Sequence, residues 1–76
     1  GAALDLCIMQ GNRRLGFEFK YTSAPAMTRS LHVSLRDLRL NQVYVICPGH
    51  NRFQIAERVT VAGLDALPEI AITKKP

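Results

Sequence analysis

The sequence predicts one α/β (α+β) domain over residues 1–76, with a mixed sheet of four to five short strands in the order β-hairpin, helix, strand, strand and short C-terminal helix. Three observations lead to this prediction. Two alternating segments flank a Gly-Asn pair, a helical apolar stripe follows, and a continuous apolar run then ends at Pro48. A chain of 76 residues holds one small core, which excludes a large enzyme with a deep cleft.

The first element is a predicted hairpin over residues 3–9 and 14–21. Apolar and polar side chains alternate in both segments, as is typical of strands. Gly11-Asn12 lies between them and favours a two-residue turn, because such a turn needs positive φ. On one face the two segments carry Leu4, Leu6, Ile8, Leu15, Phe17, Phe19 and Tyr21.

The second element is a predicted helix, which Thr28 can cap and which should end near Asn41. Val33 and Leu40 point away from its apolar stripe, so they either make a second buried contact or are ordinary exposed residues. The stripe consists of Met27, Leu31, Leu35 and Leu38.

Residues 43–47 form a continuous apolar run, typical of a central strand that is covered on both faces. Because a helix precedes this strand, we expect it to run parallel to the second strand of the hairpin. Residues 53–55 and 59–62 predict two short strands or one bent strand, and residues 64–67 predict a helical turn before Pro68.

The two ends of the sequence suggest an excised fragment. Residues 1–3 are Gly-Ala-Ala in place of an initiator methionine, which we interpret as a cloning remnant. Residues 73–76 predict a frayed tail.

Cys7 and Cys47 stand 40 positions apart, without the spacing of a zinc site or of a disulfide framework. We therefore expect two buried structural thiols in a reducing cytosol. His32 and His50 have no ligand at metal-binding spacing, so neither is assigned a metal. No apolar run is long enough for a bilayer and no targeting signal is visible, which predicts a cytoplasmic protein without membrane contact.

The hairpin turn places charged residues side by side. A two-residue turn pairs positions whose numbers sum to 23, so Asp5 faces Glu18 with Lys20 close by, while a four-residue loop would place Asp5 opposite Lys20. Two facing carboxylates destabilise a sheet, and a divalent cation such as Mg²⁺ would relieve their repulsion. The alternative is a solvated ion pair between Glu18 and Lys20.

Asp5 followed thirteen residues later by Glu18-Phe19-Lys20 resembles the PD-(D/E)XK nuclease signature, with Leu4 in place of its proline. The stretch from Gly16 to Asp37, with Leu38, Val43-Tyr44-Val45 and Pro48-Gly49, is similar to the C-terminal domain of unknown function of bacterial predicted AAA-type ATPases. The resemblance covers residues 4–67.

The resemblance implies a truncated restriction-endonuclease-like core with Asp5, Glu18 and Lys20 as catalytic residues. Asp5 and Glu18 would hold Mg²⁺ or Mn²⁺. It also implies an ATPase region upstream in the same protein, whereas these 76 residues contain no Walker A motif and therefore no ATP site. The alternative functions are a relict site in a noncatalytic interaction or dimerisation module, and a freestanding basic domain that binds nucleic acid.

Four basic residues, Arg29, His32, Arg36 and Arg39, share one face of the predicted helix, and the formal net charge is +4. This face predicts contact with nucleic-acid phosphates, and the alternative is a solvated amphipathic helix.

Only one convincing helix is available to cover the two faces of the sheet. We therefore expect the fragment to form a homodimer through a bare sheet face, a free strand edge or the side of the helix that carries Val33 and Leu40.

Overall fold

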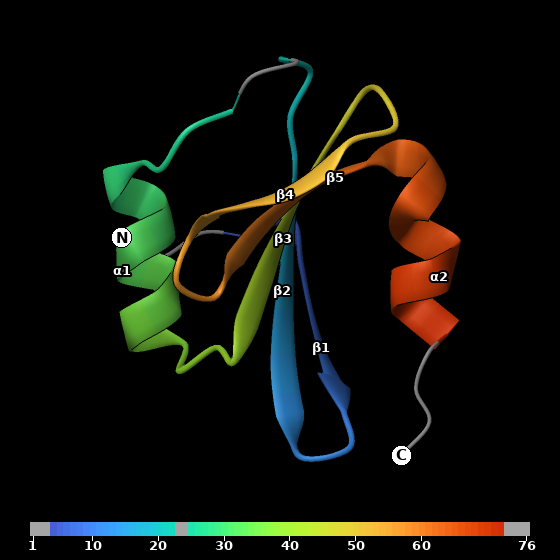
Figure 1. The fold of residues 1–76 in the computed structure, drawn as a ribbon. Helices are drawn as coiled ribbons and strands as arrows, with labels where there is room; N and C mark the ends of the chain where they lie inside the picture. Colours follow the sequence, from blue (N-terminus) through green and yellow to red (C-terminus); the bar gives the residue numbers. More distant parts are fainter. Residues whose placement is uncertain (1–3, 23–24, 73–76) are drawn as a thin grey trace.

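In the computed structural model, which describes residues 4–22 and 25–72, a five-stranded mixed sheet lies between two helices (Figure 1). The elements are β1 (Leu6–Gln10), β2 (Arg13–Phe19), α1 (Arg29–Asp37), β3 (Gln42–Cys47), β4 (Arg52–Ala56), β5 (Val59–Gly63), the 3-10 turn η1 (Leu64–Ala66) and α2 (Leu67–Ile72). The strand order is β1-β2-β3-β5-β4, so β3 is the central strand, as predicted. The regions predicted as a cloning remnant and a frayed tail lie outside the described residues.

The N-terminal hairpin has the predicted turn and register. Leu6 pairs with Phe17 and Gln10 with Arg13, so the paired numbers sum to 23, and Gly11 has φ +62°. β2 then runs parallel to β3, as expected from the helix between them, and β3 runs parallel to β5. The carboxyl ends of β2, β3 and β5 therefore meet at one edge of the sheet, and their amino ends meet at the opposite edge.

Helix α1 begins as predicted and ends earlier than predicted. The side chain of Thr28 accepts a hydrogen bond from the N–H of Leu31 at 3.1 Å. At the other end Arg39 adopts φ +53°, its N–H donates to Arg36, and the N–H of Leu40 donates to Leu35. These bonds form a Schellman motif, in which the left-handed position is usually glycine. Because arginine occupies that position here, no glycine marked the helix end in the sequence.

A second residue with positive φ lies in the turn between β4 and β5. Ala56 pairs with Val59 across a two-residue loop, in which Arg58 has φ +67°. The left-handed conformation costs an L-amino acid about 1–2 kcal/mol, and glycine or asparagine adopts it more easily. Arg39 and Arg58 thus occupy positions that other residues would fill at lower cost.

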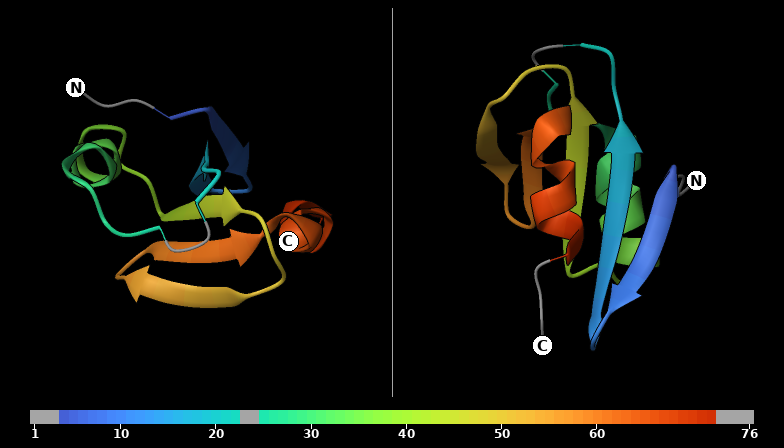
Figure 2. Two further views of the ribbon diagram at one scale, coloured as in Figure 1. Left: turned by 90° about the horizontal axis from the view of Figure 1, so that it is seen from above. Right: turned by 90° about the vertical axis from the view of Figure 1, so that its right-hand side faces the viewer.

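The C-terminal helix continues past the position where the sequence predicted it to stop. Pro68 is the second residue of α2, and proline is tolerated in a first helical turn because its missing N–H has no intrahelical partner there. Ile70 is buried with Phe17 and Ile46 on the sheet face opposite α1. Figure 2 shows the two helices on opposite sides of the sheet. The prediction that one helix leaves a face without cover was therefore wrong.

The core on the α1 side contains Cys47, as predicted, and also Leu40, which is 1 % exposed. Leu40 therefore belongs to the chain's own core and cannot contribute to a dimer interface. Cys7 was predicted to be buried but is exposed. Its strand, β1, lies at the edge of the sheet. Alternation puts Met9 on the same face as Cys7, and Met9 is also exposed. Helix α1 therefore does not cover this part of the sheet.

None of the helices in the described ranges has the length and apolar character that a membrane crossing requires.

Candidate functional site

The carboxyl end of β2 brings together the three residues of the nuclease-like signature. Asp5 immediately precedes β1, where its N–H donates to the carbonyl of Phe17 at 3.1 Å. Its carboxylate Oδ2 accepts the N–H of Phe19 at 2.7 Å. The side chain of Asp5 is thereby bound to the backbone of the residue that separates Glu18 from Lys20.

Glu18 and Lys20 form an ion pair at the same end of β2. The distance from Lys20 Nζ to Glu18 Oε2 is 2.7 Å, and the side chains are 37 % and 14 % exposed, respectively. The hydrogen bond that Lys20 donates to Glu18 raises the pKa of Lys20 above its usual value, and the charges of Glu18 and Asp5 act in the same direction. Lys20 is therefore a firmly protonated ammonium beside two carboxylates.

These groups surround one open hollow of about 340 Å³, which is lined by Leu4, Asp5, Glu18, Phe19, Lys20 and Ser30. Ser30 comes from the first turn of α1 and was not predicted. Only the parallel arrangement of β2 and β3 indicates its position, because the connecting helix must start near the carboxyl end of β2.

The donor chemistry of the hollow suits a hard divalent cation. One carboxylate oxygen of Asp5 accepts the N–H of Phe19, and one carboxylate oxygen of Glu18 pairs with Lys20. The other oxygen of each carboxylate accepts no hydrogen bond from the described residues. Mg²⁺ is commonly held by one or two carboxylates and several waters. Among residues 4–22 and 25–72 there is no group of three or more His, Cys, Asp or Glu side chains that would form a fuller cage. The residues therefore fit a weak, water-rich site.

The predicted basic face is only partly assembled. Arg29, His32 and Arg36 are exposed on α1, but Arg39 lies beyond the last helical turn and does not continue this face. His32 and Arg36 instead line a separate hollow of about 370 Å³ with Arg58 and Glu57, from the turn between β4 and β5. No sequence pattern connects Arg58 with this face, since 22 positions separate it from Arg36.

A second ionic contact joins the loop after β3 to the 3-10 turn η1, at the carboxyl edge. His50 Nδ1 pairs with Asp65 Oδ2, and this hydrogen bond raises the pKa of His50 above its usual value. Close beside it, a Cβ on Gly63 would lie 2.0 Å from the carbonyl oxygen of Gly49. Glycine at position 63 therefore permits the loop after β3 to contact the end of β5.

The chain is similar to two uncharacterized mycobacterial proteins, one from Mycobacterium tuberculosis and one from Mycobacterium bovis. Each is 36 % identical over 66 residues, which is 87 % of this chain and 15 % of the relative. The chain therefore spans about one seventh of the length of these curated relatives. No family model matches the sequence. No solved structure matches it either.

Proposed function

We propose that this chain is a nuclease-like domain that binds or cleaves nucleic acid with Mg²⁺ or Mn²⁺ held by Asp5 and Glu18. The observation that supports this proposal is the placement of Asp5, Glu18 and Lys20 around one hollow at the carboxyl end of a parallel strand. Ligands of open α/β sheets commonly bind at such ends.

Each group has a distinct role in the proposed chemistry. A divalent ion supplies a Lewis acid for the phosphodiester and lowers the pKa of water. Asp5, whose carboxylate is fixed by Phe19, and Glu18 would orient that ion. The ammonium of Lys20, 2.7 Å from Glu18, would position the attacking water or neutralise charge that develops on the phosphate.

The domain would be the C-terminal part of an AAA-type ATPase that acts in the bacterial cytoplasm. The similar mycobacterial proteins leave room for such a region, because most of their length lies outside the match. The full-length reading frame tests this proposal directly. A Walker A motif upstream would support it, and a long upstream region without one would contradict it.

A titration with Mn²⁺ tests the metal site. Paramagnetic broadening of backbone amide signals should centre on residues 4–6 and 17–20 and should disappear in Glu18→Gln. The matched control is Asp65→Asn, which removes an acid beyond the end of β5. Broadening that survives Glu18→Gln, or that is uniform along the chain, would count against the site. Cleavage of a plasmid with Mn²⁺, measured on the same variants, separates catalysis from binding.

A noncatalytic dimerisation module is the second candidate, and an exposed apolar surface favours it. Phe19, Tyr21 and Leu64 are 42 %, 98 % and 58 % exposed. With Ile46 and Pro48 they line a hollow of about 270 Å³. A second copy of the chain would cover this surface. Light scattering across a tenfold dilution tests this candidate, because a monomeric mass at every concentration would exclude it.

A further inference from the structure

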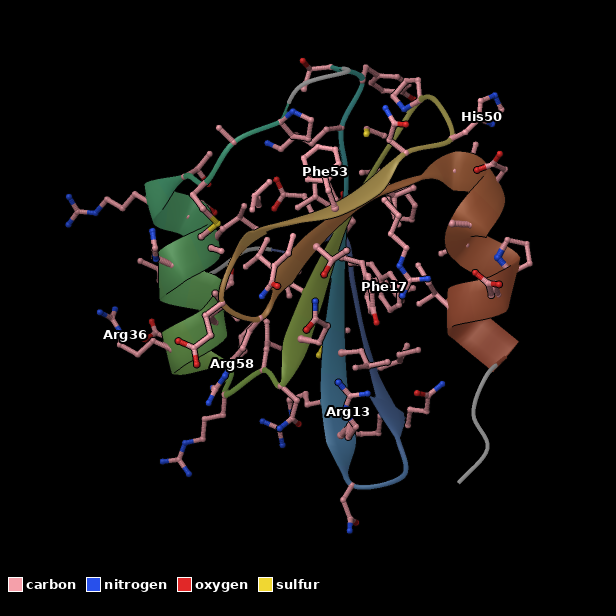
Figure 3. The ribbon with its side chains drawn as sticks, viewed as in Figure 1. Arg13, Phe17, Arg36, His50, Phe53 and Arg58 are labelled. Carbon is pink, nitrogen blue, oxygen red and sulfur yellow. The ribbon has the colours of Figure 1, made fainter. Side chains whose placement is uncertain are left out.

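The amino ends of the parallel strands form the most basic part of the described chain. We define the basic edge as Arg13, Arg14, Arg36, Arg39 and Arg58, which lie at the start of β2, the last turn of α1, the approach to β3 and the turn before β5. Two carboxylates, Asp37 and Glu57, accompany these five arginines, which gives an excess of three positive charges (5 − 2). Figure 3 shows Arg13, Arg36 and Arg58 away from the end of the molecule that carries His50.

The rest of the described chain has the opposite charge. Outside the basic edge, the formal charges of the described residues sum to −1 (3 − 4). The basic residues there are Lys20, Arg29 and Arg52, and the acidic ones are Asp5, Glu18, Asp65 and Glu69. The net positive charge of the described residues is therefore concentrated at the basic edge. A polyanion approaching the domain would be attracted to this edge rather than to the opposite end, which carries the carboxylates of Asp5 and Glu18.

Three side chains of the basic edge are available to a ligand. Arg14 donates to the carbonyl of Leu38 at 2.8 Å, and Arg36 donates to Asp37 at 2.8 Å, so both have partners within the fold. The side chains of Arg13, Arg39 and Arg58 have no hydrogen bond or ion pair to any residue in the described ranges.

Two of these three arginines also stand in left-handed positions. Arg39 has φ +53° at the end of α1, and Arg58 has φ +67° in the β4–β5 turn. Glycine or asparagine would adopt either conformation with less strain. An arginine that occupies such a position while its side chain has no hydrogen-bond or ion-pair partner among the described residues is a reason to look for function. A guanidinium supplies a planar fork of donors that matches phosphate oxygens.

We propose that the basic edge, through Arg13, Arg39 and Arg58, binds the phosphate backbone of a nucleic acid. These arginines come from three separate segments, namely the start of β2, the loop after α1 and the β4–β5 turn, so they suit the repeated phosphates of a strand better than one small anion. A membrane fits less well, because membrane binding needs apolar side chains beside the basic ones. Among the exposed large apolar residues of the described chain, only Met9 is the strand partner of a basic-edge residue, Arg14. The proposal rests on the proposed function only for the class of ligand.

The basic edge and the carboxylate hollow lie at opposite ends of β2. Five residue steps from Arg13 to Glu18 correspond to about 17 Å of strand at roughly 3.3 Å per residue. A nucleic acid that touches both sites must therefore extend over about five nucleotides, at roughly 3.4 Å each. Fragments shorter than this should bind the basic edge without reaching the hollow.

Fluorescence anisotropy with a labelled 20-base-pair duplex in EDTA tests the proposal. The variants are Arg39→Gly and Arg58→Gly, which remove a charge and relieve the left-handed strain. Each should lower the slope of log affinity against log salt by about one. Arg39→Lys and Arg58→Lys should keep most of the slope. The matched control is Arg52→Gln, which removes the same charge from β4, where Arg52 pairs with Glu69.

Thermal unfolding completes the test. The midpoints of the two glycine variants should equal that of the parent or exceed it by up to about 5 °C, since removing the strain stabilises the fold. The proposal would be overturned if the salt slopes of the two glycine variants were at least as steep as that of Arg52→Gln. It would also be overturned if their unfolding midpoints lay below that of the parent. Binding to anionic lipid vesicles with the same dependence on arginine, but not to the duplex, would also overturn it.

The two proposals fail separately. EDTA removes metal from the duplex measurement, so loss of Mn²⁺ binding in Glu18→Gln leaves the result at the basic edge unchanged. Conversely, a domain with a working metal site and equal slopes in every arginine variant would keep the proposed function and lose this inference.

Discussion

The carboxylate of Asp5 accepts the backbone N–H of Phe19 at 2.7 Å, so the acidic residue before β1 is fixed to the middle residue of Glu18-Phe19-Lys20. One oxygen of Asp5 therefore has a structural role, and the other is left for a ligand. The two roles can be separated by substitution, because an amide oxygen can accept the same hydrogen bond without carrying a charge.

Asp5→Asn should leave the free energy of unfolding almost unchanged and abolish Mn²⁺ binding. Asp5→Ala should also lower that free energy by about 1 kcal/mol, the typical net value of one hydrogen bond. Urea denaturation of both variants provides the measurement. Equal losses of stability in the two variants would mean that the bond to Phe19 contributes little.

Lys20→Met should strengthen Mn²⁺ binding several-fold. The ammonium now pairs with Glu18 at 2.7 Å and competes with any cation for that carboxylate. If the domain cleaves nucleic acid, the same variant should lose cleavage, because Lys20 would position water or neutralise phosphate charge. Calorimetry gives the affinity and plasmid nicking gives the rate. Weaker metal binding in Lys20→Met would contradict the competition.

The His50–Asp65 contact should make part of the stability depend on pH. The partner raises the pKa of His50, so this stabilisation is fully present below about pH 6.5 and disappears as the pH rises through the raised pKa. An NMR titration should show the His50 ring titrating above about 6.5, and returning to about that value in Asp65→Asn. An unchanged pKa in the variant would show that the contact does not persist in solution.

Gly63→Ala should destabilise the fold by about 2 kcal/mol or more, the cost of forcing atoms into a packed site. The added Cβ would lie 2.0 Å from the carbonyl oxygen of Gly49, and the clash involves backbone that cannot rotate away. Gly11→Asn is the control, because no atom lies within 4 Å of a Cβ there and asparagine tolerates φ +62°. Thermal unfolding of both variants decides the matter.

The parts of the fold that were predicted correctly depend on neighbours in the sequence. Gly11-Asn12 specifies a turn by its own φ requirement, and this turn then fixes the register that brings Asp5 to the end of β2. Thr28 caps α1 through a residue only three positions away. Such local chemistry can be recognised without knowledge of the tertiary structure.

The parts that were predicted incorrectly depend on tertiary context. The end of α1 was placed too late because arginine, not glycine, occupies the left-handed position 39. Cys7 was assigned to the core because a free cysteine usually behaves as a small hydrophobe, but it lies on edge strand β1 and is exposed. Ser30 and Arg58 join their hollows through the packing of α1 against the sheet, which no short motif encodes.

The position of β3 has a consequence for how the chain folds. Its neighbours, β2 and β5, are both parallel partners, and a parallel pair cannot close through a tight turn. The antiparallel pairs β1–β2 and β4–β5 are local hairpins that close within microseconds, whereas the central ladders require large loops to close. We therefore expect the two outer hairpins to form early and the middle of the sheet to form last, with docking of β3 as the rate-limiting step.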